Sequence, residues 1–294
     1  MSLSLSCFPR GCLLMRALFR IVSAVVGCGL FAVGAGHAAD GVALRVESEV
    51  FVDDTGEPAS RSLTLFDGET TWDFLAASAG KDEAAAGVAG CRQIILHDPA
   101  RERLVALDPR LKVKTQIDCL RLERLSASLG KWARSADDKL IRWAGDVDIG
   151  SGIVARDGAI ELKGPRVCYT VEYADAPSPA AADAYRGFAD TAILLKALLQ
   201  PGGLPPFPRL AINRHVAATG GIPSEVRLEL GGPLPLLGAS SATLRSVHRT
   251  LSGITDADRR QIDDAAALMA VAEELDLAGF IDRRATDEVA RRGS

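Results

Sequence analysis

The chain has few of the residues that usually mark a metal or catalytic site. It contains only four histidines and six cysteines in 294 residues, and aromatic residues make up 5%. The histidines form no HxH or HxxxH pair, and no two cysteines form a CxxC pair. The ligand spacings of a zinc site are therefore missing. We predict no metal and no cofactor.

Motifs for nucleophilic, phosphate or calcium chemistry are also missing. Gly150-Ser151-Gly152 lacks the GxSxG spacing of a nucleophile elbow, and Gly80-Lys81-Asp82 lacks the other residues of a phosphate loop. Asp146-Val147-Asp148 lacks the spacing of a calcium loop. The absence of these motifs favours a non-catalytic protein, and we name no catalytic residue.

The chain also lacks a basic surface signature. Its net charge is −4, and residues 1–38 hold three arginines and no acid, so the remainder is more acidic still. Nucleic-acid binding needs a stripe of Lys and Arg, which is not seen. We therefore predict no nucleic-acid partner.

The first 38 residues have the three parts of a secretory signal peptide. Arg16 and Arg20 follow Met15, residues 21–35 are almost unbroken apolar sequence, and Gly36-His37-Ala38 supplies small residues before Ala39. The apolar run is too short and too rich in Gly and Ala to span a bilayer comfortably. We predict cleavage after residue 38 and a periplasmic or secreted protein, with translation starting at Met1 or Met15.

A second interpretation of the leader is a lipoprotein signal. Val25-Val26-Gly27-Cys28 resembles a lipobox, whose Cys28 would become a lipidated N-terminus. Apolar residues continue through Leu30, Phe31 and Val33, so this cut would fall inside the apolar run. We expect membrane contact to be transient, unless Cys28 is lipidated.

After the leader, much of the chain alternates with the period of two typical of half-buried strands. Val42, Leu44, Val46 and Val50 fall on one side of such a segment. Turn formers and hairpin signals separate further strands, as at Asp98-Pro99 and Gly164-Pro165. We expect about nine short strands, including residues 62–66, 70–75, 93–97, 103–107, 113–117, 160–162, 167–173, 226–230 and 243–251.

Helical patterns interrupt the strands. Asp118 is a candidate N-cap for a helix that places Leu122, Leu125, Leu129 and Trp132 on one side. Ser178-Pro179 opens the clearest helix, over residues 178–200, and the Pro-rich residues 204–208 lead into a short helix over 209–218. Thr255 caps a long final helix, and residues 283–294 are expected to be a frayed charged tail. The apolar stripe of the clearest helix contains Tyr185, Phe188, Ala192, Leu195 and Leu199.

Hairpin order implies antiparallel pairing, so the elements predict one α+β domain over residues 39–282. Its architecture is a strongly curved antiparallel sheet, or half-barrel, with helices packed on the concave face. Cys91, Cys119 and Cys168 remain after cleavage. An exported location would permit one disulfide, Cys91–Cys119 or Cys119–Cys168, but small buried free thiols are equally consistent.

Three segments carry a resemblance. With Tyr185-Arg186-Gly187-Phe188-Ala189, the Pro205–Leu210 run and the segment Ile95-Leu96-His97-Asp98-Pro99, the chain resembles an uncharacterised family of exported bacterial proteins. More distantly, its order of elements is similar to the periplasmic lipoprotein carriers of the LolA, LolB and LppX type. That resemblance implies a half-barrel holding an acyl chain under helices, and it supplies no residue-by-residue site.

These observations predict a cleft rather than an active centre. The leading hypothesis is an exported protein that binds a lipid-like ligand, or an acylated or other envelope partner, between the sheet and its helices. The alternatives are an envelope hydrolase that uses acids not identifiable from sequence, and a structural or assembly protein without a ligand. The residues expected to line the cleft are Val46, Val50, Tyr169, Val171, Phe188 and Leu195. In this hypothesis the apolar stripe of the helix over residues 178–200 lies opposite the strand residues of this set.

Overall fold

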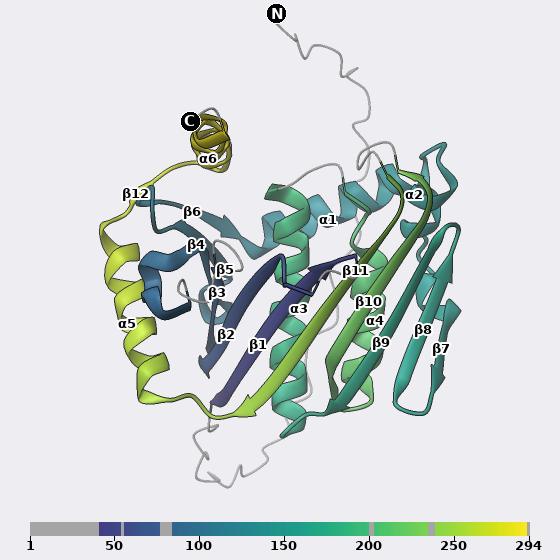
Figure 1. Ribbon diagram of the computed structural model, residues 1–294, viewed down its shortest axis with the longest axis horizontal. Helices are drawn as coiled ribbons and strands as arrows, with labels where there is room; N and C mark the ends of the chain where they lie inside the picture. Colours follow the sequence, from purple (N-terminus) through teal and green to yellow (C-terminus); the bar gives the residue numbers. More distant parts are fainter. Residues whose placement is uncertain (1–40, 54–55, 77–83, 200–202, 235–238, 293–294) are drawn as a thin grey trace, which may run out of the picture. The chain divides into compact units, whose positions relative to one another are not determined.

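Alternating side chains build a large sheet in the computed structural model, which describes residues 41–53, 56–76, 84–199, 203–234 and 239–292 (Figure 1). Within these residues the sheet has 12 strands, in the order β12-β6-β5-β4-β3-β2-β1-β11-β10-β9-β8-β7. All neighbours pair antiparallel except β12 and β6. The strands are β1 (Val42–Val52), β2 (Ser60–Gly68), β3 (Thr70–Ala76), β4 (Cys91–Asp98), β5 (Arg103–Asp108), β6 (Val113–Asp118), β7 (Ile153–Arg156), β8 (Ala159–Gly164), β9 (Val167–Asp175), β10 (Gly221–Leu234), β11 (Ala239–Ser252) and β12 (Glu273–Glu274).

Six α-helices accompany the sheet in the described part of the chain, so the α+β class is confirmed, with more strands than expected. Residues 40–294 form one compact unit. The predicted leader lies outside the described residues. The helices are α1 (Cys119–Arg134), α2 (Lys139–Ala144), α3 (Pro179–Leu199), α4 (Phe207–Ala218), α5 (Asp256–Val271) and α6 (Leu277–Arg292), with short 3-10 turns η1 (Ala84–Gly90), η2 (Pro99–Arg101) and η3 (Ile149–Gly152).

Local capping explains where the helices begin. The Asp118 side chain accepts a hydrogen bond from the backbone N of Leu120 at 2.7 Å, and Ser178 Oγ accepts from Ala181 N at 3.1 Å. Thr255 and Asp258 form a reciprocal capping box at the start of α5. The N-caps predicted from sequence are therefore confirmed at all three positions.

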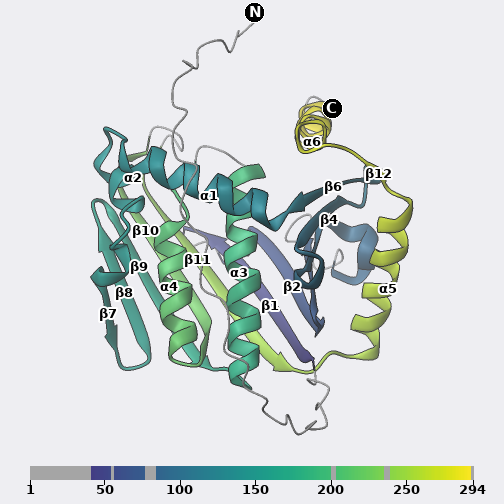
Figure 2. The ribbon, with the colours of Figure 1, turned by 180° about the vertical axis from the view of Figure 1, so that it is seen from behind.

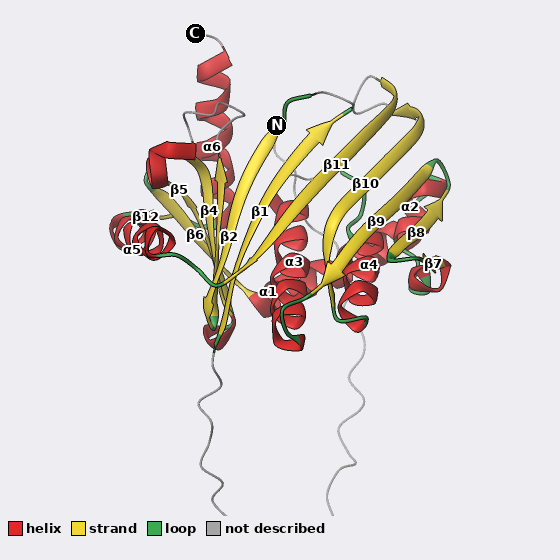
Figure 3. Ribbon diagram, turned by 60° about the horizontal axis from the view of Figure 1, so that its bottom comes forward, coloured by secondary structure: helices red, strands yellow, loops and turns green. Residues whose placement is uncertain are grey.

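The two faces of the sheet are covered differently (Figures 2 and 3). We call the side that carries Leu44, Val46 and Phe66 the α3 face, because these residues pack in one cluster with α3. The same face continues across β9 and β10, where Val171 and Val226 pack with Ile212 and Val216 of α4.

The opposite side of the sheet, which carries Leu65, Trp72 and Phe74, is the α5 face. There Ile262 and Met269 of α5 complete a second apolar cluster. Further along this face, β1 and β11 carry the charged residues Arg45, Glu47, Glu49 and Arg249. Apolar clusters thus lie on both sides of β2–β5. The part of the α5 face formed by β1 and β11 is instead charged.

The C-terminal prediction was wrong in two respects. The final helix is two helices, because Glu273 and Glu274 pair with β6 and the Asp276 side chain then caps α6 by accepting from Gly279 N at 2.7 Å. Residues 283–292 are helical rather than frayed. Phe280 is fully buried beside Ala106 and Val113, and Arg284 pairs with the buried Asp108 at 3.2 Å. Charges that suggested a solvated tail instead fix α6 to the sheet.

A smaller correction concerns α1. Leu122 is buried as expected, but Trp132 is 54% exposed, and Gly130 and Ala133 are the buried residues of the last turns. Phe207 at the start of α4 lies 3.3 Å from the position that a Cβ would occupy on Gly130. The close approach of α4 therefore favours a small residue at position 130.

No helix among the described residues is long and apolar enough to cross a membrane.

Candidate functional site

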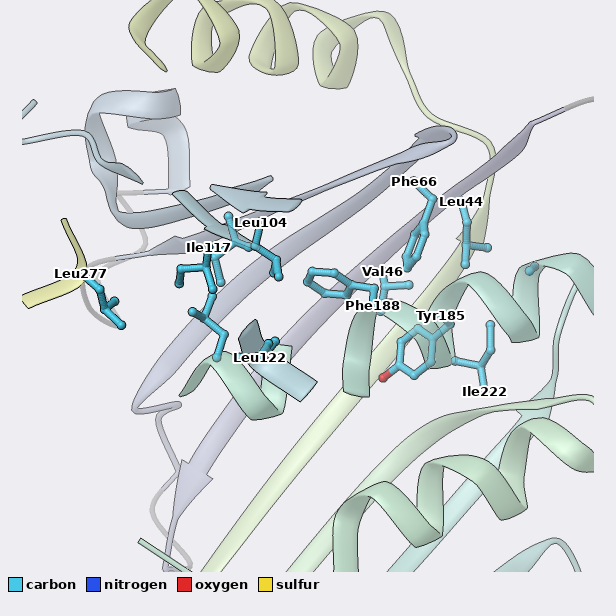
Figure 4. Close-up of a cluster of buried hydrophobic side chains, with 13 residues drawn as sticks. Leu44, Val46, Phe66, Leu104, Ile117, Leu122, Tyr185, Phe188, Ile222 and Leu277 are labelled. Carbon is cyan, nitrogen blue, oxygen red and sulfur yellow. The ribbon is translucent and has the colours of Figure 1, made fainter. Parts of the chain in front are cut away.

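Under α3 the layer is closely packed with apolar side chains. The Phe66 ring lies 6.0 Å from Phe188, edge to face, and 6.4 Å from Tyr185, measured between ring centroids. Figure 4 shows both α3 rings directed toward the strands that carry Leu44, Val46 and Phe66. Such aromatic pairs contribute about 0.5–1.5 kcal/mol beyond the burial of their area. This cluster holds the helix on the sheet.

The structure places five of the six residues expected to line a cleft in two separate clusters, and Val50 in neither. Val46, Phe188 and Leu195 lie together in the cluster under α3. Tyr169 and Val171 belong to the cluster under α4, so the expected contact between them and the α3 stripe is not formed. Val50 is on the same face and is half-buried.

Two pockets among the best formed by the described residues lie elsewhere, and none of these six residues lines them. One, of about 500 Å³, opens on the α5 face beside Leu63, Phe74 and Cys91. Its charged residues are already paired: Arg45 with Glu47 at 2.8 Å, and Arg61 with Glu49 at 2.8 Å. The other, of about 600 Å³, lies between η3 and the outer side of α4. It is lined by Phe207, Leu210 and Ala211 together with charged residues such as Asp148 and Arg214.

The layer between α4 and the sheet differs because it contains a buried cation. Pro206 and Pro208 start α4, and Arg209 follows in the first turn, where its backbone N donates to Pro206 O at 3.0 Å. Helical spacing places Arg209 on the same side as the buried Ile212, Asn213 and Val216. The helix therefore carries the Arg209 side chain toward the sheet.

Arg209 has no carboxylate within ion-pair distance among the described residues. Its Nη1 is buried and has no hydrogen-bond partner there. Burial lowers the pKa of the guanidinium, while Tyr185, Tyr169 and Asp190 act in the opposite direction. An uncompensated buried charge is costly, since buried charges in native proteins are normally paired. This cation is the clearest departure from ordinary packing in the described residues.

Two tyrosines lie within electrostatic reach of Arg209. Burial raises the pKa of Tyr169 on β9 to about 12, and burial also raises the pKa of Tyr185 on α3. Arg209 lowers both values, but by less than burial raises them. Both phenols therefore keep their protons at neutral pH and can donate hydrogen bonds.

Asp190 and Asn213 join the two helices beside this cation. Asn213 Nδ2 donates to Asp190 Oδ1 at 2.8 Å, and Asn213 Oδ1 is buried without a partner. Burial raises the pKa of Asp190, and the hydrogen bond from Asn213 and the charge of Arg186 lower it. The carboxylate is thus held by Asn213 rather than by an ion pair with Arg209.

His248 on β11 faces the same layer. Its Nδ1 lies 2.8 Å from Ser48 Oγ on β1, and its Nε2 lies 2.9 Å from Ser246 Oγ. Burial, and then the charge of Arg209, lower its pKa to about 3. The imidazole is therefore neutral at physiological pH. A base this weak would be a poor activator of either serine.

Asp73 is a buried acid at the edge of the apolar cluster. It occupies the α3 face of β3, and Thr64 Oγ1 on β2 donates to its Oδ1 at 2.7 Å. Burial raises its pKa to about 6, and the Thr64 hydrogen bond opposes that change. Asp73 thus accepts from a strand residue, whereas Asp190 accepts from Asn213 of α4.

Three of these polar residues combine depth with partial accessibility. Burial dominates the pKa changes of Arg209, His248 and Asp73, which places all three deep in the molecule. Each nevertheless keeps part of its surface accessible to water. Val50, Leu228 and Leu244, on the same face, are likewise only half-buried. The layer near Arg209 is thus less completely filled than the cluster under α3.

Sequence reasoning missed Arg209, His248 and Asp73. A signal was present for the first: an arginine three residues before Ile212 and seven before Val216 continues an apolar helical stripe. His248 gave no such signal, because its burial depends on the helices packed against β11. No local pattern marked Asp73, because its burial depends on α3.

The cysteines, His97 and Asp98 were the other residues with possible chemical roles. Cys91, Cys119 and Cys168 are free thiols, and only Cys91 is buried. In the described residues no group of three or more His, Cys, Asp or Glu side chains could hold a metal ion. His97 lies 6.3 Å from the Phe188 ring, and Asp98 caps η2, as expected for a strand that ends in a turn.

No protein-family model matches this chain, and a search of curated proteins found no match.

Proposed function

We propose that the protein binds a lipid-like ligand between the α3 face of its sheet and helices α3 and α4. In this proposal the sheet is a strongly curved half-barrel, the helices cover its concave face, and the ligand lies between them. The observation that carries it is the set of deep residues, Arg209, His248 and Asp73, that remain partly accessible to water. A deep side chain with accessible surface must border a space that water can enter.

The composition of the layer supports an apolar ligand. Val50, Leu228 and Leu244 are half-buried aliphatic residues on this face, next to the polar side chains of Ser48, Ser246 and His248. Burial of an alkyl chain contributes roughly 0.8 kcal/mol per methylene, so even a partly enclosed chain could bind at micromolar strength. A sugar or nucleotide would leave many polar groups without partners there.

The hydrolase alternative receives less support from the described residues. It requires acids or a base arranged around a reacting atom. His248 is too weak a base, and Asp73 and Asp190 each hold a separate partner within the fold. An envelope protein without a ligand is the other alternative, and the same experiment tests it.

Native mass spectrometry of the protein purified from its own host, after mild extraction, tests the binding function. We expect a co-purified species with the mass of a lipid, released on denaturation. Repeated preparations that carry no such species, combined with failure to bind added fatty-acid probes, would contradict the proposal and favour an assembly role.

Export belongs to the same proposal, because a lipid carrier of this type works in the cell envelope. We propose a periplasmic or secreted location, reached through residues 1–38. Intact-mass analysis of the host-derived protein should give an N-terminus at or near Ala39. An acylated Cys28 would show instead that the protein is membrane-anchored.

A further inference from the structure

We propose that Arg209 is the receptor for the acidic head group of the ligand, and that the ligand is a long-chain carboxylate. This inference rests on the proposed binding function and specifies its ligand class. The α4 helix places one guanidinium inside the layer, where its Nη1 is buried without a hydrogen-bond partner among the described residues and two tyrosines and a histidine lie within electrostatic reach.

The first step is the missing counter-charge. Arg209 Nη1 is buried without a hydrogen-bond partner, and no described carboxylate lies within ion-pair distance of the guanidinium. Asp190, which is within electrostatic reach, already accepts from Asn213. A buried cation with an unpartnered donor is stabilised further when an anion reaches it. A ligand that enters the layer can supply that anion.

The second step is the match between donors and head group. A guanidinium offers parallel N–H donors that fit the two oxygens of a carboxylate, and one positive charge balances one negative charge. The protonated hydroxyls of Tyr169 and Tyr185, which lie within electrostatic reach of this cation, are further candidate donors. His248 stays neutral, so it adds no second positive charge that a doubly charged phosphate would need.

The third step is the path of the alkyl chain. Tyr169 pairs in register with Leu228 on β10, and Leu228 pairs with Leu244 on β11. Val50 on β1 pairs with Ser246, which bonds His248. The half-buried aliphatic residues therefore begin beside the polar cluster and extend across three strands. A chain anchored at Arg209 can lie along them.

The test compares an acid with the matching alcohol. Fluorescence titrations with cis-parinaric acid and with its reduced alcohol would be carried out on protein purified after expression of the full chain. The wild type, Arg209→Gln, Arg209→Lys and the control Arg214→Gln would be compared. Arg214 is an exposed arginine on the same helix, so its replacement removes an equal charge outside the layer.

We expect the wild type to bind the acid at least about tenfold more tightly than the alcohol, because hydrogen bonds between charged groups are strong. Arg209→Gln should lower the affinity for the acid at least about tenfold and change that for the alcohol less than about twofold. The affinity of Arg209→Lys for the acid should lie between those of the wild type and Arg209→Gln, because lysine keeps the charge and loses the paired donors. Arg214→Gln should bind both probes like the wild type.

Other outcomes separate the two proposals. Equal binding of acid and alcohol by the wild type, or full retention of acid binding by Arg209→Gln, would overturn the role of Arg209 and leave the binding function intact. Failure of the wild type to bind either probe would overturn the binding function itself. If Arg209→Gln does not fold, as judged by circular dichroism, the wild-type ratio of acid to alcohol and the Arg209→Lys titration decide.

Discussion

The layer between the helices and the sheet has two parts that differ in the kind of side chain they bury. Under α3, Val46, Phe66 and Phe188 contact one another, and ring geometry fixes the packing. Under α4, the same layer contains Arg209, whose Nη1 has no partner, and the neutral His248. The first part lowers the free energy of the folded state. The second adds a cation with an unpartnered donor to the apolar cluster of Ile212 and Val216, an arrangement that packing alone does not require.

The comparison predicts that the largest loss of stability follows a substitution in the apolar cluster under α3. Phe188→Asp should destabilise the fold by at least about 5 kcal/mol, because it removes an aromatic core residue and buries an unpaired charge. Trp132→Asp, at an exposed position on α1, should change stability by no more than about 1 kcal/mol. Urea unfolding followed by circular dichroism measures both, and a Phe188→Asp protein with unchanged stability would show that this side of α3 faces water.

His248 gives the next largest effect, and it depends on pH. Its folded-state pKa of about 3 lies below the ordinary 6.5, so the unfolded chain binds the proton more tightly. Stability from the neutral imidazole is present above pH 6.5 and falls by several kcal/mol as pH decreases toward 3. In His248→Gln this loss should be smaller. Urea midpoints measured from pH 7 to pH 4 would reveal it, and parallel curves for the two proteins would refute it.

Asp73 should show the opposite dependence on pH. Its folded-state pKa of about 6 lies above the ordinary 3.8, so its contribution is favourable below about pH 4 and is lost as pH rises through 6. Asp73→Asn keeps an acceptor for Thr64 and removes the charge. We expect the variant to be more stable than the wild type by about 2–3 kcal/mol at pH 7, with no advantage at pH 4. An equal difference at both values would mean that Asp73 does not titrate in this range.

The sequence predicted the packed part better than the polar part, for a physical reason. Period-two strands, the caps at Asp118, Ser178 and Thr255, and the buried stripe of α3 are local patterns, and the structure confirms them. Hydrophobic periodicity is strong where side chains have no polar role. It cannot show that Phe188 meets Phe66, because that contact joins elements more than 100 residues apart in the sequence.

The predictions that failed have two causes: charged residues were interpreted as solvated, and the order of strands was unknown. Arg284 and Asp108 form an ion pair that fixes α6, although the tail was expected to fray. Arg209 was placed at the start of a short helix, and its inward direction was not considered. Tyr169 and Val171 were expected opposite α3, but the order of strands puts them under α4. Strand order depends on long-range pairing, which no local pattern encodes.

The smallest effect on folding carries the most information about function. Replacing Arg209 with Met removes a buried unpaired cation and keeps an unbranched apolar stem. We expect Arg209→Met to be more stable than the wild type by about 1–2 kcal/mol in the absence of ligand. An arginine that serves the fold through Tyr169, Tyr185 and Asp190 would instead make this variant less stable.

The most direct test of the account is the melting temperature of wild type and Arg209→Met, each with and without palmitate. A ligand at 100 times its Kd stabilises a protein by about 2.7 kcal/mol, which corresponds to a rise of roughly 5–10 °C for a domain of this size. We predict that Arg209→Met melts higher than the wild type without palmitate, and that palmitate raises only the wild type by this amount. A variant that melts lower than the wild type and still responds fully to palmitate would contradict the account.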